Sequence, residues 1–202
     1  MSNAQNSPLQ LFVIRHGETE WSLSGQHTGS SEIALTAHGE DEARALAPTL
    51  GEFAFARVLT SPRQRARRTC ELAGLGAAAE VEPSLQEWGY GEYEGLTPAE
   101  IAKRRPGWEV FRDGCPGGET PQQISDRADR LLQSLRALEG NVALFTHGHF
   151  GRALAVRWIG LSIAIGRRFA LRTASIGILG YEPGHSDAPV IALWNEVPAL
   201  RA

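Results

Sequence analysis

The stretch LQLFVIRHGETEW, residues 9–21, passes without a break from an apolar run into charged side chains. Residues 9–14 read as a buried β-strand, because a short apolar run that ends at a turn residue is typical of one. An arginine and a histidine, Arg15 and His16, follow at once, and Gly17 turns the chain. Two side chains that can both be cationic repel each other. We therefore expect an anion between them, or chemistry at one of them.

Outward from this stretch, strands alternate with helices along the chain. Helices with capping or breaking residues at their ends are expected at residues 37–50, 62–74, 124–140 and 148–159. Further strands are expected at residues 56–60, 141–146, 171–181 and 189–195. This alternation predicts an α/β fold, a three-layer α/β/α sandwich with a mostly parallel central sheet.

Ligands of such sheets collect at the carboxyl ends of the strands. Three motifs stand directly after expected strands: RHG at 15–17, TSPRQRARRT at 60–69 and THGH at 146–149. They bring basic side chains to one rim, namely Arg15, His16, Arg63 or Arg65, and His147. Guanidinium groups and helix N-termini suit a phosphate dianion. Each motif alone is more often a turn or a solvated helix face, so the prediction of a phosphate site depends on their convergence.

The composition limits the classes of partner and compartment. We expect a single domain over residues 8–202, after a polar tail at 1–7 that is disordered or a cloning remnant. The net charge of −3 favours neither nucleic acid nor an anionic membrane. No apolar stretch approaches the ~18 residues that span a bilayer, and no secretory leader is visible. With only Cys70 and Cys115, a disulfide framework is not expected, so we expect the cytoplasm.

A metal site is the first alternative use of the histidines. His147 and His149 could ligate zinc. On one strand, however, they would point to opposite faces, and no Asp or Cys cluster completes the set. Nearby arginines would also repel a cation. We therefore expect no metal and no cofactor.

Six motifs, in this order and at these spacings, resemble the histidine phosphatase superfamily, also called the phosphoglycerate-mutase-like family. They are RHGETEW (15–21), ALTAHGEDEA (34–43), TSPRQRARRT (60–69), LQEWGYGEYEG (85–95), GGET (117–120) and THGH (146–149). The resemblance extends from about Leu9 to Asn195. It implies a phosphoglycerate-mutase-like fold and phosphoryl transfer through a phosphohistidine.

The resemblance also implies a role for each matching residue. His16 would be the nucleophile, Glu87 the proton donor, and the phosphoryl oxygens would be held by Arg15, Arg65 and His147. This agrees with the chemistry, because neutral imidazole is a nucleophile, cations stabilise charge on the phosphoryl oxygens, and a carboxylic acid can protonate the leaving oxygen.

Two assignments in this set have rivals. Arg65 is preferred to Arg63 because Ala66 follows it, as the family's pattern requires. Glu18 and Glu92 are rival acids on spacing alone, and we interpret Glu18 as a structural partner for the loop.

One departure from the family pattern points to a branch. Ser22 stands where much of the family has Asn, and segments 20–29, 87–95 and 111–124 look closer to the sedoheptulose-1,7-bisphosphatase-like phosphatases. That branch acts on sugar bisphosphates, so the expected substrate is a small phosphorylated metabolite, a sugar phosphate or bisphosphate. The substrate-binding residues expected on this basis are Ser22, His27, Thr28, Tyr90 and Arg152.

Other side chains could also serve the substrate. Further cationic residues that could bind a second phosphate group are Lys103, Arg104, Arg105 and Arg112. Such a run of charges more often faces solvent. Trp21 and Trp88 could be pocket walls or plain packing.

Two other functions compete with a metal-independent phosphomonoesterase. A 2,3-bisphosphoglycerate-dependent phosphoglycerate mutase would need a covered site, and the mutases carry a longer insertion where about 60 residues here separate Glu87 from His147. A non-catalytic phospho-ligand binder would not need the nucleophile and the proton donor, and both are present. Hydrolysis is therefore the favoured interpretation. A homodimer is compatible with the sequence but not required by it.

Overall fold

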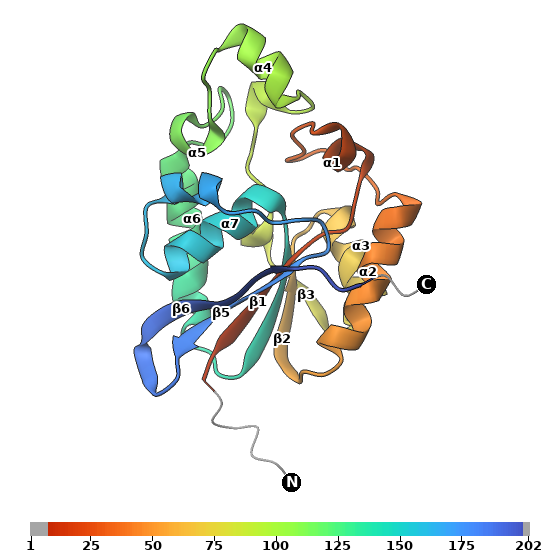
Figure 1. Ribbon diagram of the computed structural model, residues 1–202, viewed down its shortest axis with the longest axis vertical. Helices are drawn as coiled ribbons and strands as arrows, with labels where there is room; N and C mark the ends of the chain where they lie inside the picture. Colours follow the sequence, from red (N-terminus) through yellow and green to blue (C-terminus); the bar gives the residue numbers. More distant parts are fainter. Residues whose placement is uncertain (1–7, 200–202) are drawn as a thin grey trace.

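A six-stranded mixed sheet runs through the middle of the computed structural model, which describes residues 8–199 (Figure 1). The expected tail at residues 1–7 lies outside these residues. The strands have the spatial order β3-β2-β4-β1-β5-β6, and four of them, β3, β2, β4 and β1, are mutually parallel. β5 is antiparallel to β1, and β6 to β5. Their bounds are β1 Gln10–Arg15, β2 Phe55–Thr60, β3 Ala79–Val81, β4 Asn141–Thr146, β5 Ile176–Glu182 and β6 His185–Glu196.

Helices cover both faces of the sheet. α2 (Ala37–Leu50) and α3 (Gln64–Leu72) lie on one face, and α6 (Pro121–Leu135) and α7 (Gly148–Trp158) on the other (Figure 1). Alternate side chains of β1 enter the two cores: Leu11 and Val13 pack with the α6–α7 cluster, whereas Phe12 and Ile14 pack with the α2–α3 cluster. The predicted three-layer α/β/α sandwich is therefore confirmed.

Short elements cover the carboxyl end of the parallel strands, and the sequence analysis did not predict them. α1 (Glu20–Ser24), α4 (Pro98–Arg104) and α5 (Val110–Asp113) lie at this end of the molecule (Figure 1). Turns of 3₁₀-helix occur at Gly76–Ala78, Pro83–Leu85, Gly91–Tyr93 and Ile163–Arg168. α1 has no buried residue, so it carries no apolar period that sequence reasoning could detect.

Several expected boundaries were wrong. β6 begins at His185, four residues before the expected residue 189. α3 begins at Gln64 rather than Pro62, because Arg63 keeps an extended backbone as its N-cap. α6 ends at Leu135, five residues before Gly140. β5 begins at Ile176 rather than at residue 171, because a turn in which Ala174 has φ 46° precedes it.

Strand register places the three motifs side by side. Arg15 at the end of β1 lies opposite Thr146 at the end of β4, and Thr60 at the end of β2 lies opposite Phe145. The backbone ladder continues past the strands, since His16 N donates to Thr146 O at 3.1 Å. The residues that follow the three strands therefore share one rim, as the sequence predicted.

No helix among residues 8–199 is long and apolar enough to cross a membrane.

The loop after β1 passes very close to the first turn of α2. A Cβ atom added at Gly17 would lie 2.3 Å from the carbonyl oxygen of Gly39. The Gly17 amide also donates to the Thr69 hydroxyl of α3 at 3.0 Å. Only glycine fits here, and its neighbour His16 takes its position from this contact.

We therefore expect Gly17→Ala to lower the free energy of unfolding by about 1–3 kcal/mol, the usual cost of overpacking. Urea denaturation measures it. Gly180→Ala in β5 is the matched control, because the nearest atom to its added Cβ would be 3.8 Å away. Equal effects of the two substitutions would contradict the close approach at Gly17.

Candidate active site

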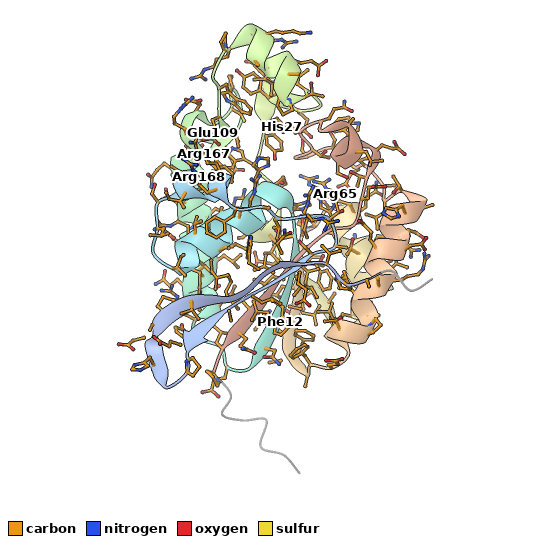
Figure 2. The ribbon with its side chains drawn as sticks, in the orientation of Figure 1. Phe12, His27, Arg65, Glu109, Arg167 and Arg168 are labelled. Atoms are coloured by element: carbon orange, nitrogen blue, oxygen red, sulfur yellow. The ribbon has the colours of Figure 1, made fainter. Side chains whose placement is uncertain are left out.

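A cavity of about 280 Å³ opens at the shared rim of β1 and β4. Three of the expected catalytic residues line it, and so do all five expected substrate-binding residues: Arg15, His16, Glu87, Ser22, His27, Thr28, Tyr90 and Arg152. Trp21 and His149 also line the cavity. His27 lies toward the covering elements and Arg65 toward the sheet (Figure 2).

His16 presents one ring nitrogen for reaction. Its Nδ1 lies 2.7 Å from the carbonyl oxygen of Gly17, so Nδ1 carries the proton and Nε2 keeps its lone pair. Burial, and then the charges of Arg65 and Arg15, lower the pKa of His16 well below its ordinary value. The imidazole is therefore neutral at neutral pH, which is the nucleophilic form.

Arg15 lies at the end of β1, beside the first residue of α7. One of its terminal nitrogens, Nη1, donates to Leu171 O at 2.6 Å. Its Nε is buried and has no hydrogen-bond partner within residues 8–199. Gly148 permits the approach, because a Cβ there would be only 3.4 Å from the guanidinium. Arg15 thus has donors left for an anion next to His16.

Arg65 and His147 lie behind His16 rather than in the cavity wall. The Arg65 guanidinium donates to His147 Nδ1 at 3.2 Å and to three carbonyl oxygens, those of Thr28, Gly29 and Ser31. Four of its five N–H groups are used in this way. Because His147 accepts at Nδ1, its Nε2 donates to Ser61 Oγ at 2.7 Å. Direct contacts from Arg65 and His147 to phosphate stay a prediction.

Glu87 is held by the N-terminus of α7. Its Oε1 accepts from the amides of Trp88 (2.9 Å) and Phe150 (2.8 Å), and its Oε2 accepts from the amide of His149 (2.9 Å). Burial alone would raise the pKa of a carboxyl group. Here the His149 side chain, then His147 and the His149 backbone amide, outweigh burial and hold the pKa of Glu87 well below its usual range. In the free protein Glu87 is therefore a carboxylate.

His149 lines the cavity but was not among the site residues expected from the sequence. It lies in the first turn of α7 and not on a strand with His147, so the geometric argument made against zinc was wrong. Its Nδ1 is 2.6 Å from the Tyr90 hydroxyl and 3.8 Å from Glu87 Oε2. Burial and then Arg152 lower the pKa of His149 to about 4. The THGH motif, whose second histidine falls in the first turn of the helix, is the signal that could have found it.

Arg152 and His27 form the far wall of the cavity. Arg152 donates from Nε to Gly148 O at 3.0 Å and lies 5.0 Å from the centre of the Phe111 ring. His27 stacks on Tyr90, with ring centres 4.6 Å apart. Arg152 and Arg15 give one cavity two guanidinium groups, which suits an anionic ligand.

Except for Trp21, the remaining candidates fall outside the cavity wall. The cationic run and Arg112 are exposed on α4, the turn after it and α5: Lys103, Arg104, Arg105 and Arg112. Glu18 accepts from the Thr36 hydroxyl at 2.7 Å, which agrees with a structural part in the loop. Glu92 is exposed. Trp88 is fully buried against Phe111, so it is packing, whereas Trp21 lines the cavity.

Comparison with known families matches residues 11–197 to the histidine phosphatase superfamily, branch 1. The chain belongs to this superfamily. An acid phosphatase of Mycobacterium tuberculosis is 45% identical over 197 residues, covering 96% of this chain and 97% of that protein. The sedoheptulose 1,7-bisphosphatase of Saccharomyces cerevisiae is 36% identical over 191 residues, covering 76% of this chain and 69% of that protein.

A solved structure of this histidine phosphatase fold is also similar. It is the product of an open reading frame of Mycobacterium tuberculosis, with a TM-score of 0.86 and 41% identity. The match covers 96% of this chain and 100% of that one. The family resemblance inferred from the motifs is therefore confirmed, together with the fold that it implied.

The tautomer of His16 can be tested directly. Nitrogen-15 NMR should show His16 neutral at about pH 6.5, the ordinary histidine pKa, with its proton on Nδ1. His149 should become charged only near pH 4. The His16→Gln variant assigns the signals. A proton on Nε2, or a charged His16 ring at that pH, would contradict the geometry described for this histidine phosphatase.

Proposed function

We propose that this protein is a phosphomonoesterase that acts through a phosphohistidine on a small phosphorylated metabolite, a sugar phosphate or bisphosphate. The observation that carries the proposal is at His16. A neutral imidazole lines the cavity with its Nδ1 tied to Gly17, and Arg15 and Glu87 line the same cavity. A nucleophile, a cation for the phosphoryl oxygens and a carboxylate for the proton are thus together.

The reaction then has two displacements at phosphorus. The lone pair of His16 Nε2 forms the N–P bond while the bond from phosphorus to the ester oxygen breaks, and that oxygen leaves as an alcohol with a proton from Glu87. Water next attacks phosphorus, the N–P bond breaks, and the Glu87 carboxylate takes a proton from the water. Orthophosphate leaves, and His16 returns to its neutral form.

The first proton has to arrive with the substrate, because Glu87 is ionised in the free protein. A phosphate monoester with a second pKa near ~6 still carries that proton below neutral pH. Beside the buried carboxylate, repulsion between the two anions favours a single proton shared by them. Glu87 is then protonated, and able to act as an acid, only when a phosphate occupies the cavity.

The substrate is small and anionic on this proposal. The cavity has room for a metabolite rather than a polymer, and Arg152 in its far wall suits a second anionic group. A cytoplasmic location and a homodimer stay predictions from the sequence.

His16→Ala is expected to abolish release of inorganic phosphate from sugar mono- and bisphosphates, assayed without added metal and with a chelator present. Mass spectrometry of the wild type during turnover should show one phosphoryl group on His16. Transfer between 2- and 3-phosphoglycerate without any release would favour the mutase alternative. Binding of these compounds with no release and no phosphohistidine would favour the non-catalytic binder.

Arg152→Ala is expected to lower kcat/KM for a sugar bisphosphate by ~10-fold to ~100-fold, because a charge-assisted hydrogen bond contributes about 1.5–3 kcal/mol. The loss for a monophosphate should be clearly smaller. Arg112→Ala is the matched control, since Arg112 is exposed on α5 and pairs with its neighbour Asp113. Equal losses on mono- and bisphosphate would contradict a second anion at Arg152.

A further inference from the structure

Arg127 of α6 is buried and uses every N–H of its guanidinium group. Nε and Nη2 donate to the two carboxylate oxygens of Glu119, at 3.0 and 2.8 Å. Nη1 donates to the carbonyl oxygens of Ser84 and Gln86, both at 2.8 Å, and Nη2 donates to that of Glu87 at 3.2 Å. We call this pair the Arg127–Glu119 clamp.

The other half of the clamp, Glu119, holds the chain on the far side of Glu87. Its Oε2 also accepts from the Gly89 amide at 2.7 Å, and its backbone amide donates to Gly89 O at 2.7 Å. Its carbonyl oxygen accepts from the Trp88 indole at 2.8 Å. The clamp therefore forms hydrogen bonds to the chain before Glu87, at Glu87 and after it. Glu119 belongs to the GGET motif, which the proposed reaction does not otherwise use.

The clamp also reaches the groups that hold the Glu87 carboxylate. The Arg127 guanidinium lies 4.0 Å from the centre of the Phe150 ring. Phe150 is the residue whose amide donates to Glu87 Oε1. One guanidinium thus contacts both the segment that carries Glu87 and the end of α7 that binds its carboxylate.

Segment 84–89 needs such donors because most of it belongs to no sheet or helix. A single 3₁₀ turn ends at Leu85, and the next begins only at Gly91. Buried carbonyl oxygens without ladder partners must be satisfied by something else. A planar fork of five donors does this for three carbonyls and a carboxylate at once, which a lysine ammonium cannot do.

We propose that the Arg127–Glu119 clamp positions Glu87 for proton transfer, so that Arg127 is a positioning residue for the reaction. The inference rests on the proposed function, in which Glu87 protonates the leaving oxygen. Loosening the clamp displaces the carboxylate while His16 and Arg15 keep their places. A misplacement of about 1 Å in a reacting group costs on the order of 10²-fold in rate.

The clamp can be tested with two substrates whose leaving groups differ in their need for a proton. An alkyl phosphate releases a poor leaving group that needs the proton, whereas a nitrophenyl phosphate releases a stable phenolate that does not. Because kcat/KM covers steps only up to departure of the leaving group, Arg127→Lys should lower kcat/KM for the alkyl phosphate at least ~10-fold and for the aryl phosphate less than ~3-fold. Both are measured by phosphate release.

Arg157→Lys is the matched control. Arg157 makes a two-point ion pair with Asp129, at 2.8 Å for each oxygen, and donates to the carbonyl oxygen of Leu161. It joins α6 and α7, the helices that Arg127 and Phe150 also connect, but within residues 8–199 it makes no hydrogen bond to segment 84–89. Weakening the Arg157–Asp129 ion pair should lower stability without changing the ratio of kcat/KM for the alkyl phosphate to that for the aryl phosphate. Thermal unfolding of every variant is measured alongside.

Three outcomes overturn the clamp: an unchanged Arg127→Lys enzyme, equal losses on both substrates, or the same ratio shift in Arg157→Lys. If Arg127→Lys does not fold, Glu119→Gln replaces it, because it weakens the same pair and keeps the side chain's shape. Glu87→Gln in the same assay separates the two proposals. If Glu87→Gln shows no preference for the aryl phosphate, the proposed role of Glu87 fails; if only the clamp variants show none, the clamp fails.

Discussion

β1 and β4 lie side by side in parallel, with Arg15 opposite Thr146, and the reactive groups take their places from that register. The residue after each strand lies at the same rim: His16 follows β1, and His147 follows β4. The backbone bond from His16 N to Thr146 O extends the ladder one step beyond the strands. A slip of one residue would turn the side chains at this rim to the other face of the sheet.

The site tolerates buried charge because each charged group has a fixed partner. Glu87 takes three backbone amides, two of them from the first turn of α7. Within residues 8–199 no carboxylate pairs with Arg65, but four of its five N–H groups donate to carbonyl oxygens and to His147. Burial, and then the positive charges of Arg65 and Arg15, lower the pKa of His16 and keep it neutral. The same charges leave the cavity prepared for an anion.

Sequence reasoning located the sheet, the four long helices and many of the residues that line the cavity, because apolar runs and motifs after strands indicate those features. It did not locate α1, α4 or α5, which are short and stabilised by caps and by contacts distant in sequence. It treated His149 as a strand neighbour of His147. It expected Arg65 to hold phosphoryl oxygens, which stays a prediction; in the structure three carbonyl oxygens of residues 28–31 accept hydrogen bonds from its guanidinium group.

The sequence by itself determined the family, the α/β architecture and the positions along the chain of the expected reacting side chains, because these depend on local pattern and on motif order. Only the tertiary structure decided which nitrogen of His16 is free, that Glu87 is bound to a helix end, and that Arg127 and Glu119 grip the chain around it. The contacts around Glu87 join residues about 30 to 60 positions apart, whereas His16–Gly17 and Arg127–Glu119 are close in sequence. In both cases no local pattern encodes the direction in which a buried side chain finds its partner.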